Sequence, residues 1–307
     1  MSAKKERSSG GRLFRFILLC LAALVFAMAV RADLIQVLCV ELPLPDLPAA
    51  FEGTRIVYVS DIHLTTLNSQ RKVNALFEQL AQIRPDILLL GGDYTGDDLI
   101  GRLMAGSNGE YIAKVTEARD LFFLSLANFD APLGKYAVPG DMDNLLERNA
   151  STPLKEAASL GGVRLLRDEA VRITKNGQAL TIVGVDDWRT GMQDIWSPLN
   201  GVRTGDCVIV LSHNPEALPQ LNTRPAEDSG LWADAALCGH TLGGLVRLVG
   251  YELFSPLAGN PRFTAGWHME NGTKLLISEG LNGFFLPLRF GTSPQVHVIT
   301  LVRKAAE

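Results

Sequence analysis

The sequence has few cysteines, and they do not follow a metal-binding spacing. Its 307 residues contain four, at Cys20, Cys39, Cys207 and Cys238. Their wide separations argue against a zinc-finger type of site, and so few cysteines in a chain of this length make a disulfide framework unexpected. We therefore expect buried, unpaired thiols.

A basic surface is also missing. Beyond residue 15 no basic stripe occurs, and the net charge is −4 with a pI near 5.8. Proteins that bind nucleic acid need clustered positive charge to meet phosphates, so we expect no nucleic-acid partner. The hydrophobic fraction of 47% and charged fraction of 20% exclude a disordered chain and allow a substantial core.

The longest apolar run lies near the N-terminus. Residues 16–30 (FILLCLAALVFAMAV) follow basic residues at Lys4, Lys5, Arg7, Arg12 and Arg15. The run is shorter than the roughly 20 residues that span a bilayer, but Leu13 and a snorkelling Arg15 extend it. We predict an uncleaved signal anchor over residues 1–32, while AMA at 27–29 leaves cleavage and secretion open. The positive-inside rule then places residues 33–307 outside the cytoplasm.

The remaining chain alternates strand and helix, and then becomes strand-rich. Apolar spacing predicts a helix at 69–83, and residues 97–130 are predicted helical with a loop at 106–109. A third helix is predicted at 154–160, and strands at 34–42, 54–60, 86–93, 134–140, 163–166, 170–173, 179–185, and within 207–215, 233–241, 273–280 and 295–302. This order predicts one α/β sandwich from residue 33 onward, with functional residues at the carboxyl ends of strands.

Five of these strands end in residues that bind metals. The motifs are DIH (61–63), GGD (91–93), GDMD (140–143), SHNP (212–215) and GHTLGG (239–244). Alternation along the extended backbone puts Asp61 and His63 on one face. Of the five histidines in the chain, His63, His213 and His240 lie in these turns. Imidazoles and carboxylates without thiolates favour Mn, Zn or Fe.

The ordered series of motifs resembles the calcineurin-like metallophosphoesterases. It is most similar to their membrane-associated bacterial branch, which resembles UDP-diacylglucosamine pyrophosphohydrolases. The resemblance extends over the chain after the apolar run and includes LPLRFGTSPQVHVITL at 286–301. It implies a four-layer α/β/β/α sandwich and two divalent metal ions, about 3.5–4 Å apart, that act on phosphate esters.

The resemblance also implies a role for each motif residue. The expected metal ligands are Asp61 and His63 on the first ion, Asp93 between the two ions, and Asp141, His213 and His240 on the second. Asp93 and Asp141 are also candidate catalytic residues. Arg289 is a third, because the fork of donors on a guanidinium fits a phosphate, and a structural salt bridge is the alternative role for it.

Two motifs depart from the family pattern. The family has Gly-Asn-His-Asp where this chain has Asp141 and Met142, and Gly-His-Thr-His where this chain has Leu242. Asp141 keeps an oxygen ligand and adds a negative charge. Leu242 removes an imidazole from the first ion, so we expect weaker binding there. Met142 replaces a histidine expected to assist the transition state, a role typically worth about 10²–10⁴-fold in rate.

Several other residues are secondary candidates. Asp143 and Asn214 are expected to orient metal ligands. His268 either replaces the imidazole missing at Leu242 or has a structural role, and His297 is expected to be structural. Aromatic residues that pack in the core or line a substrate rim are Trp188, Trp196, Phe284 and Phe285.

Two functions remain open from the sequence. The first is a metal-dependent hydrolase of phosphodiester, pyrophosphate or phosphomonoester bonds, anchored in a membrane and acting outside the cytoplasm. The second is a degenerate member of the same fold that binds or scaffolds, favoured by Met142 and Leu242. If residues 34–42 already form a domain strand, the domain lies close to the bilayer, and lipid-linked phosphates become candidate substrates. The oligomeric state is not indicated.

Overall fold

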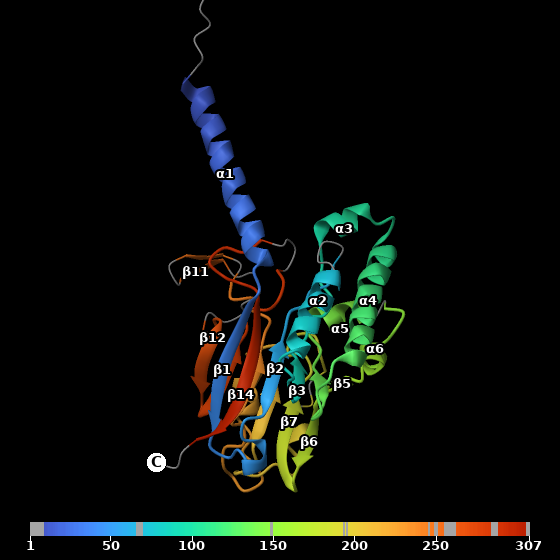
Figure 1. The fold of residues 1–307 in the computed structure, drawn as a ribbon, viewed down its shortest axis with the longest axis vertical. Coiled ribbons are helices and arrows are strands. Elements are labelled where there is room, and N and C mark those ends of the chain that lie inside the picture. Colours follow the sequence, from blue (N-terminus) through green and yellow to red (C-terminus); the bar gives the residue numbers. More distant parts are fainter. Residues whose placement is uncertain are drawn as a thin grey trace, which may run out of the picture.

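The computed structural model describes residues 9–65, 70–147, 150–192, 194, 196–244, 246–248, 251–254, 262–283 and 288–304 (Figure 1). Two of the aromatic candidates, Phe284 and Phe285, lie outside these residues. A long N-terminal helix projects from one end of a layered α/β body.

The N-terminal helix α1 runs from Ser9–Asp33 and is longer than the apolar run alone. Its segment Gly11–Asp33 has 23 residues and is long and apolar enough to cross a membrane, by length and composition. At 1.5 Å per residue this segment is about 35 Å long, against a hydrocarbon thickness of about 30 Å. None of its most apolar window is buried against the rest of the described chain.

The first sheet has six strands in the order β1-β14-β2-β3-β4-β5. Their bounds are β1 Gln36–Leu44, β14 Gln295–Arg303, β2 Arg55–Val59, β3 Ile87–Leu90, β4 Lys135–Ala137 and β5 Arg164–Leu165. Strands β2 to β5 are parallel, as expected for strands linked by helices. Strand β14 is antiparallel to β2, and β1 is parallel to β14.

The second sheet also has six strands, in the order β12-β13-β9-β8-β7-β6. Their bounds are β12 Gly266–Glu270, β13 Thr273–Ile277, β9 Ala235–Cys238, β8 Val208–Leu211, β7 Gln178–Gly184 and β6 Glu169–Lys175. The four central strands are parallel. Each edge strand is antiparallel to its neighbour: β12 forms a hairpin with β13, and β6 forms one with β7. A separate pair, β10 Val246–Leu248 and β11 Tyr251–Phe254, lies apart from both sheets.

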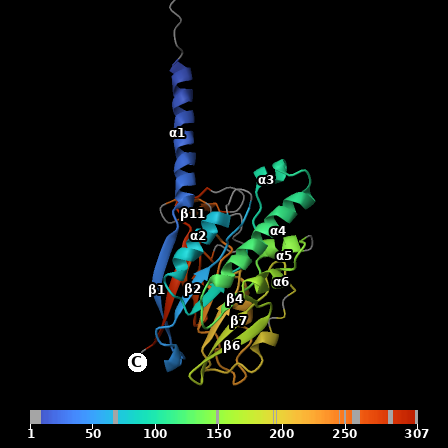
Figure 2. The same cartoon turned by 45° about the vertical axis from the view of Figure 1, so that its right-hand side comes forward.

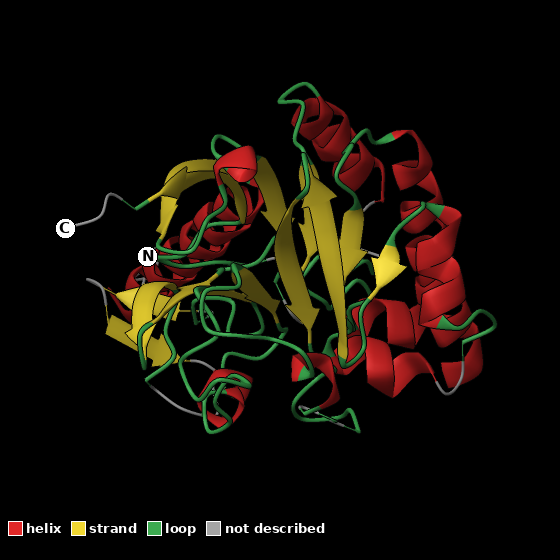
Figure 3. Cartoon of the chain, turned by 90° about the horizontal axis from the view of Figure 1, so that it is seen from below, coloured by secondary structure: helices red, strands yellow, loops and turns green. Residues whose placement is uncertain are grey.

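Three apolar layers hold the sandwich together. One lies between the sheets and includes Tyr58 of β2 and Ile209 of β8. A second lies between the first sheet and helices α2 Gln70–Ala81, α4 Asn108–Ser125 and α6 Leu154–Leu160. The third covers the outer face of the second sheet with the short elements η3 Ser197–Leu199 and α7 Ala217–Leu221. Figure 3 shows the resulting layers end-on, and they confirm the predicted α/β/β/α order.

The remaining described helices are short: η1 Ala49–Phe51, α3 Leu99–Met104, η2 Leu126–Asn128 and α5 Asp141–Glu147. The predicted helical region 97–130 therefore contains two α-helices, α3 and α4, and the short η2 that follows α4. The two α-helices separate before Asn108 because the Ser107 hydroxyl caps α4 by accepting from the amide of Glu110, at 3.2 Å. The break thus falls slightly earlier than the predicted loop.

The expectation of buried thiols is only half correct. Cys207 and Cys238 are buried in central strands of the second sheet, whereas Cys20 and Cys39 are exposed. Cys20 lies on α1 and Cys39 on β1, the edge strand of the first sheet, and neither position is covered by another described element. All four are free thiols.

Strand polarity decides where α1 joins the body. His297 of β14 pairs with Tyr58, one residue from the carboxyl end of β2. Gln295 therefore lies just beyond that end, and it pairs with Gln36, the first residue of β1. Because α1 ends at Asp33, it enters the fold at the same end as the carboxyl ends of β2, β3 and β4.

Candidate metal centre

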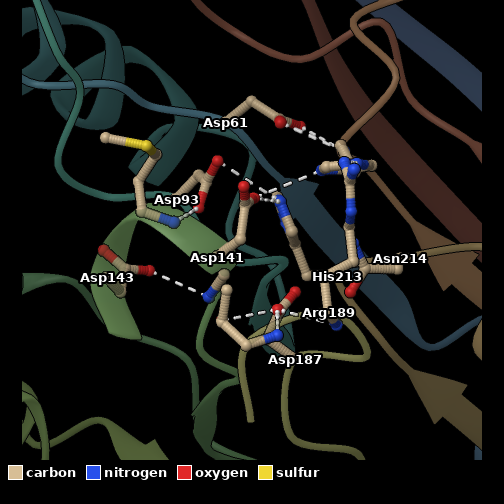
Figure 4. Close-up of polar contacts among 12 residues, drawn as sticks. Asp61, Asp93, Asp141, Asp143, Asp187, Arg189, His213 and Asn214 are labelled. Carbon is tan, nitrogen blue, oxygen red and sulfur yellow. Dashed lines mark hydrogen bonds and ion pairs between the residues drawn. The ribbon is translucent and has the colours of Figure 1, made fainter. Parts of the chain in front are cut away.

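The five predicted strand ends meet at this same end of the sandwich. Asp61 and His63 follow β2, Asp93 follows β3, and Asp141 begins α5 after β4. His213 and His240 follow β8 and β9 of the second sheet. Figure 4 shows the carboxylates and imidazoles directed toward a common centre between the two sheets. Two groups could each hold a metal ion: Asp141, His213 and His240, and Asp61, Asp93 and His213.

The group around Asp141 has short distances between its potential ligand atoms. Asp141 Oδ1 lies 3.2 Å from His213 Nε2 and 3.2 Å from His240 Nδ1. His213 Nε2 is also 3.3 Å from Asp93 Oδ2. The ring centroids of the two histidines are 5.1 Å apart and edge to face. Three to four donor atoms therefore surround one position.

The tautomer of His213 indicates what this position accommodates. Its Nδ1 donates to the carbonyl oxygen of Gly91 at 2.8 Å, so in the neutral ring Nε2 carries a lone pair. Among the described residues, His213 Nε2 and Asp141 Oδ1 are buried atoms without a hydrogen bond of acceptable geometry. Two electron-pair donors placed together in a buried site repel unless a cation or a proton lies between them. A divalent cation fits this donor set.

The other group is completed by His63. Its Nε2 is 3.9 Å from Asp61 Oδ1 and 3.8 Å from Asp93 Oδ2. Burial lowers the pKa of His63 to about 4, so the imidazole is neutral near pH 7, the form that binds metals. The backbone amide of His240 donates to both Asp61 oxygens at 3.1 and 3.2 Å, which fixes that carboxylate.

The carboxylates respond differently to burial. Burial raises the pKa of Asp93 well above its usual value, which shows how costly a charge is there without a counter-ion. Burial also acts to raise the pKa of Asp141, but the close approach of the His213 and His240 rings outweighs it and lowers that pKa. A cation held between Asp93 and Asp141 supplies the positive charge that both ionised carboxylates need.

Backbone strain is concentrated at the ligand turns. Asp61, His63, Asp93, His240 and Leu242 all have positive φ, at 53°, 42°, 53°, 69° and 55°. Each such residue costs of the order of 1–3 kcal/mol, and such strain is typical of functional sites. The packed strands on either side hold these turns in place.

Glycine is required where the turns approach one another. Gly92 has φ +89°, and a Cβ there would lie 2.9 Å from His213 Nδ1. A Cβ on Gly140 would collide with the amide and carboxylate of Asp93. Larger residues at these positions would separate the ligand loops.

Two residues predicted to support the ligands connect loops instead of ligands. Asp143 Oδ1 accepts from the amides of Tyr94 and Thr95 at 3.0 and 3.3 Å, and Oδ2 accepts from Gly140 at 3.0 Å. It thereby ties the Asp93 loop to the Asp141 loop. Asn214 Oδ1 accepts from the amide of Trp188 at 2.8 Å, which links the β8 and β7 loops.

The two departures from the family pattern have different surroundings. The Met142 side chain packs with Tyr111, Ile112, Val115 and Leu146 in a small core beneath α4, and its amide donates to Asp93 Oδ1 at 2.9 Å. Leu242 is 1% exposed and lies beside Asp61, since a Cβ on Gly280 would touch both side chains. The position of the missing imidazole is therefore filled by apolar atoms next to the first ligand.

Arg289 lies next to the site, and its guanidinium donates to backbone carbonyls. It is 1% exposed, and burial lowers its pKa to about 10. Its Nη1 donates to the carbonyl of Leu242 at 3.5 Å, and Nη2 donates to those of Gly280 and Asn282 at 3.3 and 2.9 Å. These contacts hold the turns that carry Leu242 and Asp61 together.

The remaining candidates are outside the centre. His268 Nε2 is hydrogen bonded to the carbonyl of Thr264 at 2.7 Å, and the side chain lines a surface cavity with Leu42 and Lys274. His297 is buried beside the Tyr58 ring. Trp188 packs on the outer core of the second sheet, and Trp196 lies under the guanidinium of Arg224.

A sixth loop, which follows β7, also contributes to the site, although it is not among the five sequence motifs. After β7, the Asp187 carboxylate accepts from the amides of Arg189 and Thr190 at 3.0 and 2.7 Å and forms a tight turn. This turn directs the otherwise exposed Arg189 inward, with Nη1 2.9 Å from His240 Nε2 (Figure 4). The sequence signal was present, because Asp186 and Asp187 directly follow a predicted strand as the other site residues do.

Comparison with known proteins shows the family to which this chain belongs. The sequence model described as calcineurin-like phosphoesterase matches residues 54–244, which include all six candidate ligands. The chain belongs to this family, and it is a phosphoric ester hydrolase of the metallophosphoesterase type. The predicted family is confirmed, and the family implies divalent metal ions.

Several individual proteins are similar over most of the chain. An uncharacterized metallophosphoesterase of Aquifex aeolicus is 29% identical over 81% of this chain and 85% of its own length. Phosphodiesterase YaeI of Escherichia coli is 26% identical over 81% of this chain and 82% of its own. A transmembrane protein with a metallophosphoesterase domain from Danio rerio is 24% identical over 98% of this chain and 65% of its own.

Proposed function

We propose that the protein hydrolyses phosphodiester or pyrophosphate bonds with two divalent metal ions, Mn, Zn or Fe, held at the end of the sandwich where α1 joins it. In this proposal residues 33–307 form one catalytic domain. The carrying observation is that His213 Nε2 and Asp141 Oδ1, both buried, lie 3.2 Å apart without a hydrogen bond of acceptable geometry. Such an arrangement is expected of a cation-binding site and is unfavourable in an apolar core.

The proposed ligand sets are those that the family resemblance implies. Asp61, His63 and Asp93 would hold the first ion, and Asp141, His213 and His240 would hold the second, with Asp93 as a ligand common to both. Two such ions, when bound, would activate a water molecule and neutralise charge on phosphate oxygens. In this proposal Asp93 and Asp141 take part in catalysis as ligands of the metal ions that contact the substrate.

We propose different roles for two arginines: Arg189 contacts the substrate phosphate, a role that the sequence suggested for Arg289, and Arg289 positions the turns of the site. Arg189 projects to the second ligand group from an exposed loop, so its guanidinium can donate to a substrate phosphate oxygen. Arg289 has a positioning role, because its donors are directed at backbone carbonyls. Asp141 has the most exposed side chain of the ligand pairs, at 15%, so the site opens beside Arg189.

The first ion is the weaker of the two in this proposal. Leu242 supplies no ligand, and three protein ligands remain. Asp141 offers the second ion a carboxylate in place of an amide, so the second ion would be held more tightly than the first. The same two departures favour a second candidate, a member of the fold that binds phosphate esters without turnover.

We also propose that α1 anchors the protein and that the catalytic domain lies outside the cytoplasm. The basic residues before the apolar run favour a cytoplasmic N-terminus. The site opens at the end of the fold that α1 enters, so phosphate esters carried by lipids are the substrates nearest to it.

The test uses the full chain purified in detergent. Metal content is measured after chelation and reloading with Mn, and turnover is measured with bis(p-nitrophenyl) phosphate. We expect one tightly bound ion, a second that needs excess Mn, and loss of turnover in Asp93→Asn. The control is Glu117→Gln, the same chemical change at an exposed position on α4. Metal binding without turnover favours the second candidate, and no metal binding refutes both ligand sets.

A further inference from the structure

The short helix α3 exposes an apolar face. Over Leu99–Met104 it has four large apolar side chains that are largely solvent-exposed: Leu99 59%, Ile100 43%, Leu103 76% and Met104 80%. At 100° per residue these four positions cover an arc of roughly 140° on one side of the helix. Single exposed apolar residues are ordinary, but a continuous face of this kind marks a contact surface.

The opposite side of α3 is fixed to the body. The buried Asp98 caps the helix by accepting from the amide of Gly101. The guanidinium of Arg102 binds Asp97 through Nε at 2.5 Å and Nη2 at 2.8 Å, and it lies 5.2 Å from the centre of the Tyr111 ring. The Asp98 carboxylate is therefore buried, Arg102 is tied to Asp97 although its side chain is 42% exposed, and the apolar face is held outward.

The position of α3 matches that of α1. The helix begins six residues after Asp93, so it lies near the carboxyl ends of β2 to β4, where β1 starts and α1 ends. Figures 1 and 2, which share a vertical axis, both show α3 at the end of the sandwich from which α1 projects. The apolar face and the apolar helix thus lie at one end of the molecule.

The body is attached to α1 without a spacer. The amide of Arg289 donates to the carbonyl of Met28 at 3.3 Å, inside the last turns of α1. Lys72 at the start of α2 binds Asp33 at 2.7 Å. A lipid surface crossed by α1 therefore lies directly against this end of the sandwich, within reach of α3.

We propose that α3 is a second membrane contact, whose apolar face inserts into the bilayer surface that α1 crosses. The inference rests on the proposed anchoring role of α1. Two contacts fix the tilt of the domain, so the opening beside Asp141 faces the lipid headgroups. The substrate class that this orientation selects is a phosphodiester or pyrophosphate whose apolar part stays in the bilayer.

The first test measures the depth of α3 in full-length protein reconstituted in phosphatidylcholine–phosphatidylglycerol nanodiscs. The exposed cysteines are replaced (Cys20→Ser and Cys39→Ser), and a fluorescent label is placed singly through Leu103→Cys, Leu160→Cys or Leu19→Cys. Leu160 is the matched control, 50% exposed at the end of α6 before β5 begins, and so remote from the α1 end. Doxyl-labelled lipid is the quencher.

We expect quenching at Leu103→Cys to be at least twice that at Leu160→Cys, with strong quenching at Leu19→Cys. Equal quenching at positions 103 and 160, with Leu19→Cys quenched, refutes the α3 contact alone. Lack of quenching at Leu19→Cys refutes the anchor, and the inference with it. Protection of the position 103 label from iodide without lipid quenching indicates a protein partner or a second copy, which also overturns the proposal.

The second test separates surface orientation from chemistry. The double variant Leu103→Ser/Met104→Ser is compared with Leu160→Ser/Met269→Ser, which changes exposed residues away from α3. We expect at least a threefold loss in kcat/KM for a phosphatidyl p-nitrophenol in vesicles and none for soluble bis(p-nitrophenyl) phosphate. Equal effects on both substrates, or no effect, refute the role of α3. If the protein turns over neither substrate, the proposed hydrolysis fails while the labelling result still decides the membrane contact.

Discussion

Replacing Leu242 by histidine tests whether the first metal position is an incomplete version of the family site. Leu242 is 1% exposed, and its φ of +55° is unfavourable for leucine. Histidine adopts this region more readily, and the carbonyl at this position is held by Arg289 at 3.5 Å. The turn is therefore already shaped to present a side chain beside Asp61.

The size of the effect follows from burial and metal binding. Without metal, Leu242→His loses the burial of one leucine side chain, about 2 kcal/mol. A metal ion at a hundred times its Kd that binds only the folded state returns about 2.7 kcal/mol. The variant is therefore less stable than the parent in chelator, and at least as stable at a Mn concentration that fills the first metal position in the variant but not in the parent.

The assay combines metal content, thermal unfolding with EDTA or Mn, and turnover of bis(p-nitrophenyl) phosphate. We expect about one more tightly held ion per chain and higher turnover. Leu242→Asn is the matched control, because asparagine also tolerates positive φ and removes the same apolar surface but offers no imidazole. Equal metal content and turnover in the His and Asn variants would refute the assignment of position 242 to the first ion.

Three further outcomes are expected. Asp143→Ala removes a buried carboxylate that accepts from Tyr94, Thr95 and Gly140, and it should cost about 2–4 kcal/mol in denaturant unfolding and weaken metal retention. Arg189→Ala should lower kcat at least tenfold with unchanged metal content, Arg189→Lys should restore part of it, and an unchanged kcat would exclude a phosphate contact. Burial lowers the pKa of His297 to about 4 from 6.5, so the unfolded chain takes up a proton first as pH falls and stability declines between these values. Leucine at this position does not titrate, so the stability of His297→Leu minus that of the parent should rise by up to about 3 kcal/mol from pH 7 to pH 4.5, as measured by melting at both pH values. A difference that is the same at both pH values would contradict this.

Much of the site was predictable because strand ends are visible in sequence. The runs before Asp61, Asp93, His213 and His240 are short, apolar and bounded by glycine or polar residues, so their ends are easy to place. Parallel strands then bring their carboxyl ends to one edge, whatever the helices between them do. The four-layer fold followed from the family resemblance and is present in the structure.

Side-chain direction was less predictable. Arg289 and Arg189 are both arginines in turns, yet one is buried on backbone carbonyls and the other points to His240. Met142 lies one residue from a ligand, but its thioether packs under α4. These differences depend on contacts with residues far away in the chain, which local spacing does not encode.

The sequence by itself determined the chemistry: oxygen and imidazole donors without thiolates, in strand-end turns, after one apolar segment with a basic flank. It did so because residue type and short-range periodicity act locally. Tertiary structure alone decided that β14 runs antiparallel to β2 and brings β1 back beside it. That pairing joins residues more than 200 positions apart, and it places α1, α3 and the candidate metal centre at the same end of the fold.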